Sequence, residues 1–434
     1  MRRDRGLSRQ RIQAIHERRF RRGIDVGIIH VRMEDDKLDG PHITIHGGRR
    51  VVNFGSCSYL GLGLDARLRE AAADAVRRFG VTHSSSAVYT SLPFYGELEE
   101  ALGEMVGGHV LITPTTTLGH LNALPVLVDD DALVLVDAQA HASLIMTTQV
   151  LSSNGAEIRF LPHNDLAALE DSVAGTDPGR EVWYLADGVY SMFGDTAPIE
   201  GISDLLDRYE RLHAYVDDAH GFSWQGLHGR GTVLDRMPFH ERLVLSLSLS
   251  KSFGAGGGAV AFPNQDLARR VRLLGGPLTF GGPLQTAELG AGVESAAIHL
   301  SDEHAMLRTR MMDQIDLVRR VADRLGLPIV DRTDTPIWFV RVGDTDHAVE
   351  IARRMIDDGF YVNPSTFPAV PMGSAGIRFT HTLLHEPAHI EAMLSTLARH
   401  RTDLVDDTHV LIDLTDAALA GEAAARRPGA RGVG

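Results

Sequence analysis

Lys251 is the residue whose surroundings most favour catalysis. It follows a run of alternating apolar and serine residues, LVLSLSLS, and precedes the glycine-rich stretch FGAGGG. Glycines allow the backbone to approach a bound group closely. A lysine amine held away from water is available as a nucleophile toward carbonyl groups, with which it forms a Schiff base. The sequence therefore favours Lys251 as a Schiff-base nucleophile over a simple surface charge.

Asp217 supplies a second group that such chemistry requires. It lies at the end of an earlier apolar run, HAYVDD, and is followed by His220. A cofactor that binds through an aldehyde and stores electrons in a pyridine ring needs an acidic group beside the ring nitrogen. Asp217 and Lys251 together predict a site for pyridoxal 5'-phosphate (PLP).

Other polar residues follow predicted strands in the same way. The run ALVLVD leads to His141, VWYLAD ends at Asp187 and leads to Ser191, and LVLSLS ends near Ser250. In open α/β sheets, ligands bind beyond the carboxyl ends of the strands. We therefore expect these side chains to line one site.

The elements that must position these residues are strands alternating with helices. Seven apolar runs between residues 105 and 260 predict buried strands: HVLIT, ALVLVD, EIRFL, VWYLAD, HAYVDD, LVLSLS and GGAVAF. Such runs, bounded by polar residues or glycine, are typical of a mostly parallel sheet in an α/β architecture. Helices are expected over 65–79 and, as one or two long segments, over 284–326.

After Pro328 the pattern changes to that of a compact α+β unit. Short strands are predicted in PIWFVRV, FYVNPS and GIRFTHT, with helices over 347–358 and 386–400. We therefore predict four regions: a basic N-terminal arm and lead-in (1–50), a large PLP-binding α/β domain (51–326), a small C-terminal α+β domain (327–415) and a disordered tail (416–434).

Bulk properties exclude several classes of protein. The 434 residues suffice for two domains, and a net charge of −14 argues against nucleic acid as a partner. No apolar run reaches the roughly 18 residues of a membrane span, and MRRDRGLSRQ lacks the apolar core of a secretion signal. The single Cys57 cannot form an internal disulfide. We expect a cytoplasmic protein, and we predict no metal site.

The arginine-rich residues 1–22 either contact an acidic partner such as a carrier protein or form a solvated helical lead-in.

Four motifs occur in the order HAS, DGVYSMFGDTAPIEG, DDAHGFSWQGLHGRG and SLSKSFGAGGG. Over roughly residues 50–400 this order resembles the α-oxoamine synthase family. The resemblance implies a fold-type I PLP-dependent transferase that acts as a homodimer. It also implies decarboxylative condensation of an amino acid with an acyl-thioester, of coenzyme A or an acyl carrier protein, to give an α-amino ketone.

The resemblance also implies roles for single residues. Lys251 matches the Schiff-base lysine, which also handles the α-proton of the amino acid, and Asp217 matches the partner of the pyridine nitrogen. His220 and Ser191 match donors to the phenolic oxygen of the cofactor. His141 matches the histidine that stacks on the ring, although capping of a turn is the alternative.

The remaining matches concern the phosphate and the substrate. Thr115, Thr116, Ser248 and Ser250 lie where the family binds phosphate, and Asp187 belongs to the predicted cofactor-binding set. Arg378 in GIRFTHT matches the arginine that binds the substrate carboxylate through a bidentate pair. Its alternative interpretation is a surface arginine on an edge strand.

The substrate side departs from the family pattern. Cys57 replaces an asparagine, Tyr95 replaces a histidine, the stretch HSSSAVYTSLP lacks an arginine, and Gly281 and Gly282 replace a Ser-Thr pair. Cys57 as a nucleophile is less favoured than an inert small residue. Two alternatives stay open: another PLP reaction, such as transamination or retro-aldol cleavage, and a non-catalytic subunit.

Overall fold

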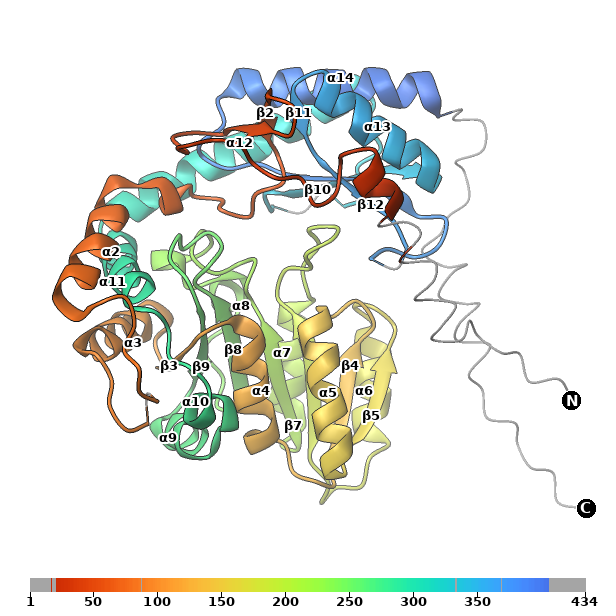
Figure 1. The fold of residues 1–434 in the computed structure, drawn as a ribbon. Helices are drawn as coiled ribbons and strands as arrows, with labels where there is room; N and C mark the ends of the chain where they lie inside the picture. Colours follow the sequence, from red (N-terminus) through yellow and green to blue (C-terminus); the bar gives the residue numbers. More distant parts are fainter. Residues whose placement is uncertain (1–16, 18–20, 87, 332–333, 368, 406–434) are drawn as a thin grey trace, which may run out of the picture.

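A seven-stranded sheet forms the centre of the larger part of the molecule (Figure 1). The computed structural model describes residues 17, 21–86, 88–331, 334–367 and 369–405. The strand order is β3-β9-β8-β7-β6-β4-β5. The strands are β3 (His109–Thr113), β4 (Leu133–Asp137), β5 (Glu157–Leu161), β6 (Val182–Asp187), β7 (Leu212–Asp217), β8 (Leu243–Ser248) and β9 (Gly258–Phe262). Strand β9 runs antiparallel to β3 and β8, whereas the other neighbours pair in parallel.

Helices cover both faces of this sheet because both faces of its strands are apolar. In β4, Leu133 and Leu135 face one core while Val134 and Val136 face the other. One face is covered by α4 (Thr116–Leu127), α5 (Ala142–Asn154), α9 (Gln265–Leu274) and α10 (Gly276–Phe280). The other is covered by α3 (Pro93–Val106), α6 (Leu166–Ala174), α7 (Ile199–Arg208), α8 (Thr232–Arg236) and α11 (Thr286–Leu300). The predicted α/β architecture is confirmed.

A smaller part is built on two three-stranded sheets. One has the order β10-β13-β12 and is antiparallel, and the other has the order β1-β2-β11. The strands are β1 (His42–Ile45), β2 (Arg49–Asn53), β10 (Ile337–Gly343), β11 (Phe360–Tyr361), β12 (Asn363–Ser365) and β13 (Ala375–Thr380). The helices around them are α12 (Glu303–Leu325), α13 (Thr345–Asp357) and α14 (Pro387–Leu404).

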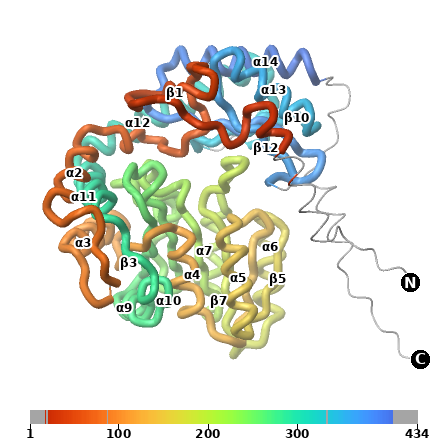
Figure 2. Tube along the Cα trace, viewed as in Figure 1, coloured from red at the N-terminus to blue at the C-terminus, as the bar shows by residue number. Residues whose placement is uncertain are grey.

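The N-terminal strands share the core of this smaller part. Ile43, Val51 and Phe54 pack in one cluster with Ile337 and Ile377. The red N-terminal trace accordingly lies among the blue C-terminal elements (Figure 2). Helix α2 (Ala66–Phe79) and the turns η1 (Leu62–Leu64) and η2 (Leu227–Gly229) complete the described elements. The domain boundaries at 51 and 327 stay predictions, but the contacts join residues 42–54 to the C-terminal part.

The predicted helices over 65–79, 284–326, 347–358 and 386–400 are confirmed, the second as α11 and α12. Most of the basic arm and the whole of the predicted tail over 416–434 lie outside the described residues. Among the residues that are described, no helix is long and apolar enough to cross a membrane.

Candidate active site

The predicted site residues converge at the carboxyl ends of β6, β7 and β8. Asp187 and Asp217 are register partners at the ends of β6 and β7. Lys251 follows the end of β8, which pairs with β7 in parallel. The charge of Lys251 acts on Asp187, Asp217 and His220, so these groups lie within electrostatic reach of one another. Lys251 and both carboxyl groups therefore lie at the carboxyl ends of neighbouring strands, where the sequence predicted the site.

Asp217 is the ionised member of the two buried carboxyl groups. Burial alone would raise its pKa, but the contact with His120 and the charges of His120, Lys251 and His141 lower it. Its Oδ1 accepts a hydrogen bond from the amide of Ala219, 3.1 Å away. Its Oδ2 lies 3.2 Å from His120 Nε2. Asp217 thus holds a fixed negative charge at the sheet edge.

Asp187 and His141 form the next part of the site. The amide of His141 donates to Asp187 Oδ1 at 3.0 Å. Burial and the neighbouring charge of Asp217 raise the pKa of Asp187 well above its usual value. The His141 side chain accepts from the amide of Ser143 at the start of α5, so the capping interpretation is observed. Burial also lowers the pKa of His141, and the charges of Asp217 and Lys251 act on it. His141 therefore caps α5 within electrostatic reach of the predicted cofactor groups.

His220 is bound to a residue from the N-terminal segment. Its Nδ1 lies 2.7 Å from the hydroxyl of Tyr59, and both side chains are buried. Burial lowers the pKa of His220 well below its usual value, so the ring is neutral near pH 7. Burial raises the pKa of Tyr59, whose hydroxyl stays protonated. The pair fixes the orientation of the His220 ring.

Arg378 and Ser191 meet across the two parts of the molecule. Arg378 Nε donates to the carbonyl of Ser191 at 2.7 Å, and its Nη2 lies 3.9 Å from Cys57 Sγ. Strand β13, which carries Arg378, is the central strand of its sheet. The alternative of a surface arginine on an edge strand is therefore wrong.

The hydroxyl residues gather where α4 begins. Thr115 is the N-cap of α4, and its side chain accepts from the amide of Leu118 at 3.1 Å. Thr116 Oγ1 contacts the carbonyl of Leu247 at 3.5 Å, and the hydroxyls of Ser248 and Ser250 lie 3.2 Å apart. The first amides of a helix have no partner within it and favour a bound phosphate.

The residues present fit PLP. The cofactor offers an aldehyde, a pyridine nitrogen and a phosphate. The chain offers an amine at Lys251, a buried carboxylate at Asp217 and the hydroxyl-rich start of α4. A Cβ placed on Gly258 would lie 2.4 Å from the amide nitrogen of Thr116, so only glycine lets β9 approach this helix start.

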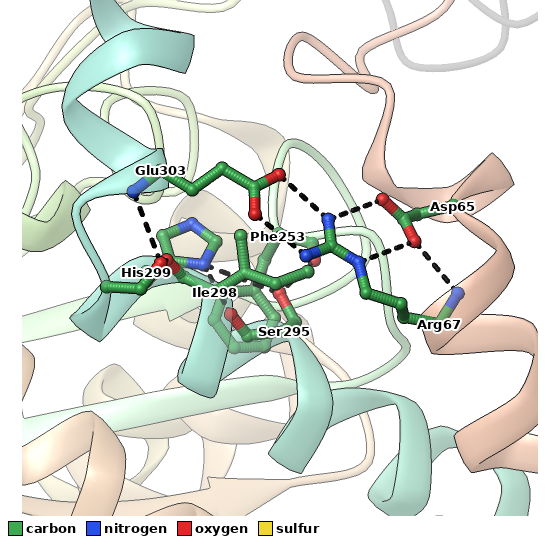
Figure 3. Close-up of polar contacts among 8 residues, drawn as sticks. Asp65, Arg67, Phe253, Ser295, Ile298, His299 and Glu303 are labelled. Carbon is green, nitrogen blue, oxygen red and sulfur yellow. Dashed lines mark hydrogen bonds and ion pairs between the residues drawn. The ribbon is translucent and has the colours of Figure 1, made fainter.

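Residues of α11 contact the segment that follows Lys251 (Figure 3). Ser295 Oγ donates to the carbonyl of Phe253 at 2.6 Å, and the His299 ring stacks on the Phe253 ring at 4.9 Å between centroids. His299 Nε2 also lies 2.8 Å from Ser223 Oγ, in the loop that follows His220. Helix α11 therefore ties the Lys251 segment to the loop that follows Asp217.

Two residues of the site were missed by the sequence analysis. His120 lies inside α4 and contacts Asp217, and Tyr59 contacts His220. Tyr59 stands two residues after Cys57, which the family resemblance places on the substrate side. The signal for His120 was weaker, because it was only a histidine one helical turn beyond the predicted phosphate-binding threonines.

Comparison with known proteins identifies the family. Residues 49–397 match the family described as aminotransferase class I and II. An 8-amino-7-oxononanoate synthase from Maricaulis maris is 32% identical over 378 residues, covering 86% of this chain and 93% of that protein. One from Dechloromonas aromatica is 31% identical over 353 residues, covering 81% and 90%. The chain belongs to this family.

Within it, the chain is an α-oxoamine synthase, so the resemblance of its motifs is confirmed. It is a PLP-dependent transferase. A solved serine palmitoyltransferase from S. paucimobilis, with PLP bound, shares the fold with a TM-score of 0.83. It is 24% identical and covers 92% of this chain and 99% of that one.

Departures from the family pattern lie side by side. Tyr95 accepts a hydrogen bond from the amide of Leu284 at 2.7 Å, and Ser86 Oγ donates to the carbonyl of Leu278 at 3.1 Å. These contacts join the altered stretch over 83–95 to the altered stretch over 276–285. The changes over 83–95 and at Gly281 and Gly282 therefore lie on adjoining segments, whereas Cys57 lies apart from them, near Arg378.

Proposed function

We propose that this enzyme condenses an amino acid with an acyl-thioester, with loss of carbon dioxide, to give an α-amino ketone. The free thiol of coenzyme A or of an acyl carrier protein is the second product. The observation that carries the proposal is the convergence of Lys251, Asp217 and His220 at one sheet edge in a chain of this family. The convergence supports PLP chemistry, and the relatives named 8-amino-7-oxononanoate synthase support this type of condensation.

Each side chain has a distinct task in this proposal. PLP, when bound, supplies an electron sink for the negative charge that develops on the amino acid Cα. Asp217 holds the proton on the pyridine nitrogen, and Lys251 removes the proton from Cα. Arg378 binds the substrate carboxylate through its guanidinium, which the Ser191 carbonyl orients.

The remaining predicted residues have the task of holding the cofactor and orienting its ring. Thr115, Thr116, Ser248 and Ser250 bind phosphate together with the first amides of α4. With PLP bound, His220 would donate to its phenolic oxygen, and Ser191 would assist. His141 would pack on the pyridine ring, with its backbone amide held by Asp187.

Free-thiol release tests the proposal directly. Purified enzyme loaded with PLP is mixed with a panel of amino acids and acyl-coenzyme A thioesters. Release that requires an amino acid and is lost in Lys251→Ala supports condensation and identifies the substrate pair. If coenzyme A thioesters are inert, acyl-carrier-protein thioesters are tested next. If both donors stay inert while PLP is bound, transamination or aldol cleavage replaces condensation as the better explanation.

Covalent mapping tests the role of Lys251 separately. Borohydride reduction of the loaded enzyme should attach PLP to the peptide that contains Lys251. Attachment to another peptide, or none, would contradict the assignment even if thiol release were observed.

We further propose a cytoplasmic homodimer. Tyr89 is 79% exposed and Phe280 is 91% exposed. They stand on the two altered stretches that the Ser86–Leu278 hydrogen bond joins. Exposed aromatic residues of this kind are typical of interfaces between subunits. Sedimentation equilibrium of wild type and of a variant carrying Tyr89→Ser and Phe280→Ser tests this, and a monomeric wild type would overturn it.

A further inference from the structure

His120 occupies the space between α4 and β7, where no solvent reaches it. Its side chain is 0% exposed. Its Nε2 lies 3.2 Å from Asp217 Oδ2, and its Nδ1 lies 3.0 Å from the hydroxyl of Tyr215. The two rings meet edge to face, with centroids 5.7 Å apart. One histidine therefore connects a phenol and the carboxylate that faces the predicted cofactor site.

The two contacts of the His120 ring differ in kind: Nδ1 and the Tyr215 hydroxyl have hydrogen-bond geometry, whereas Nε2 meets Asp217 Oδ2 as an ion-pair contact without it. An ionised carboxylate only accepts, so His120 Nε2 carries a hydrogen toward Asp217. Tyr215 has a phenol that burial keeps protonated, because its pKa is raised far above the usual value. Its hydroxyl is within hydrogen-bond distance of Nδ1, the other ring nitrogen. Tyr215 thus sets the orientation of the ring that contacts Asp217.

The position of Asp187 explains why the contact between His120 and Asp217 affects the charge at the site. Asp187 and Asp217 are register partners on adjacent strands, and both are buried. Two like charges so close in a nonpolar setting are not both stable, so one carboxyl group keeps a proton. Asp187 Oδ1 accepts one backbone amide, from His141. Asp217 accepts one backbone amide and is also contacted by His120.

We propose that His120 is a positioning residue that directs the negative charge of the Asp187–Asp217 pair onto Asp217, the member that holds the pyridine nitrogen. Tyr215 assists by orienting the His120 ring. The inference rests on the proposed role of Asp217 and adds a reason why this carboxyl group, rather than its neighbour, is charged. Lys251 and His141 also act on Asp217, and Asp137 acts on Asp187. The distribution of charge between Asp187 and Asp217 therefore depends on these groups as well as on His120.

The test uses the chemical shift of the ring nitrogen in isotopically labelled PLP bound to the full-length enzyme. That shift reports whether the nitrogen is protonated, whatever the activity. In His120→Leu the negative charge of the pair should pass to Asp187, which leaves a neutral Asp217 beside the ring nitrogen, so the midpoint for loss of the ring proton should fall by about one pH unit or more. The dissociation constant of PLP should rise about tenfold. His120→Gln keeps an N–H donor near the Nε2 position and should restore most of both values.

Matched variants separate the possible outcomes. His381→Leu removes another buried histidine, which pairs with Trp338 in the C-terminal part, and should leave the midpoint unchanged. A folded His120→Leu enzyme with the wild-type midpoint overturns the inference. If His120→Leu does not fold, Tyr215→Phe serves instead, with a smaller fall in the same direction expected and no fall overturning it.

Asp217→Asn distinguishes failure of the inference from failure of the proposed site. If this change leaves the ring-nitrogen shift as in wild type, Asp217 is not the partner of the nitrogen, and the proposed site falls. If Asp217→Asn alters the shift while His120→Leu does not, only the role of His120 is lost.

Discussion

Tyr59 and His220 share a hydrogen bond of 2.7 Å although 161 positions separate them along the chain. Tyr59 packs with the C-terminal core, whereas His220 stands in the loop after β7 of the large sheet. The bond therefore joins the two parts of the molecule beside the lysine. It makes the orientation of a site histidine depend on the packing of the N-terminal segment.

Tyr59→Phe should lower kcat/KM by about tenfold, because the loss of one buried hydrogen bond changes the free energy by about the amount that corresponds to a tenfold change in rate. The variant removes the hydrogen bond between the Tyr59 hydroxyl and His220 Nδ1, while the packing of the aromatic ring at position 59 is retained. Steady-state thiol release measures the effect. Tyr209→Phe, which removes the bond from Tyr209 to Glu170 on α6, is the control and should keep wild-type kinetics. Equal kinetics in both variants would contradict the role of Tyr59.

The sequence predicted those features that local patterns determine. The seven apolar runs became the seven strands, and six of these are buried, as expected of strands that are apolar on both faces. The prediction of burial is wrong for EIRFL, because β5 is an edge strand and its Phe160 is 41% exposed. Helix α2 begins after Asp65, whose side chain accepts from the amide of Arg67, a local capping contact readable from sequence. Lys251, Asp217 and His220 were found because each lies at the carboxyl end of a strand or within three residues of it.

The features that the sequence did not predict depend on contacts between residues that are far apart along the chain. The segment FYVNPS was predicted as one short strand, but it forms two: β11, which pairs with β2, and β12, which pairs with β13 in the other small sheet. His120 lies in α4, which is apolar and largely buried, so its histidine looks like any core residue. Only the partner Tyr215, 95 positions away, and Asp217 reveal its place.

Arg378→Lys should raise the KM for the amino acid by about 10- to 100-fold and change kcat less. Lysine keeps the charge but cannot make a bidentate pair with a carboxylate or keep the bond to the Ser191 carbonyl. Initial rates over a range of amino acid concentrations measure the change. Arg399→Lys is the control, because Arg399 on α14 forms an exposed ion pair with Asp358, the residue that caps the end of α13. A rise in KM for the acyl-thioester alone would place Arg378 on the other substrate.

Ser295→Ala should lower the free energy of unfolding by about 1–2 kcal/mol, because the buried carbonyl of Phe253 loses its donor. Urea unfolding measures this loss. Since Phe253 follows Lys251 by two positions, PLP should also dissociate faster from the variant. Ser172→Ala is the control, because Ser172 donates to a half-buried carbonyl within its own helix, α6, away from the Lys251 segment. A stability loss as small as in that control would show that the Ser295 contact does not support the Lys251 segment.

His163 should make stability depend on alkaline pH. Burial opposes its charge, but its Nδ1 lies 2.9 Å from Asp137 Oδ1 and its Nε2 lies 2.7 Å from Asp195 Oδ2, and these carboxylates raise its pKa to about 9. In the unfolded chain a histidine has a pKa of about 6.5. The folded form therefore holds the proton more tightly. The stabilisation is complete below about pH 6.5 and is lost as the pH rises through about 9.

The measurement is the free energy of unfolding in urea, for wild type and for His163→Gln, across this pH range. The wild type should be more stable than the variant by about 2 kcal/mol near neutral pH, and the difference should shrink as the pH rises past about 9. His46→Gln is the control, because His46 pairs with Glu34 at 3.5 Å while its side chain is 92% exposed. An exposed pair adds little, so that variant should match wild type at every pH. A difference for His163→Gln that stays constant across the range would mean that His163 is held neutral, and that its contacts with Asp137 and Asp195 are ordinary hydrogen bonds.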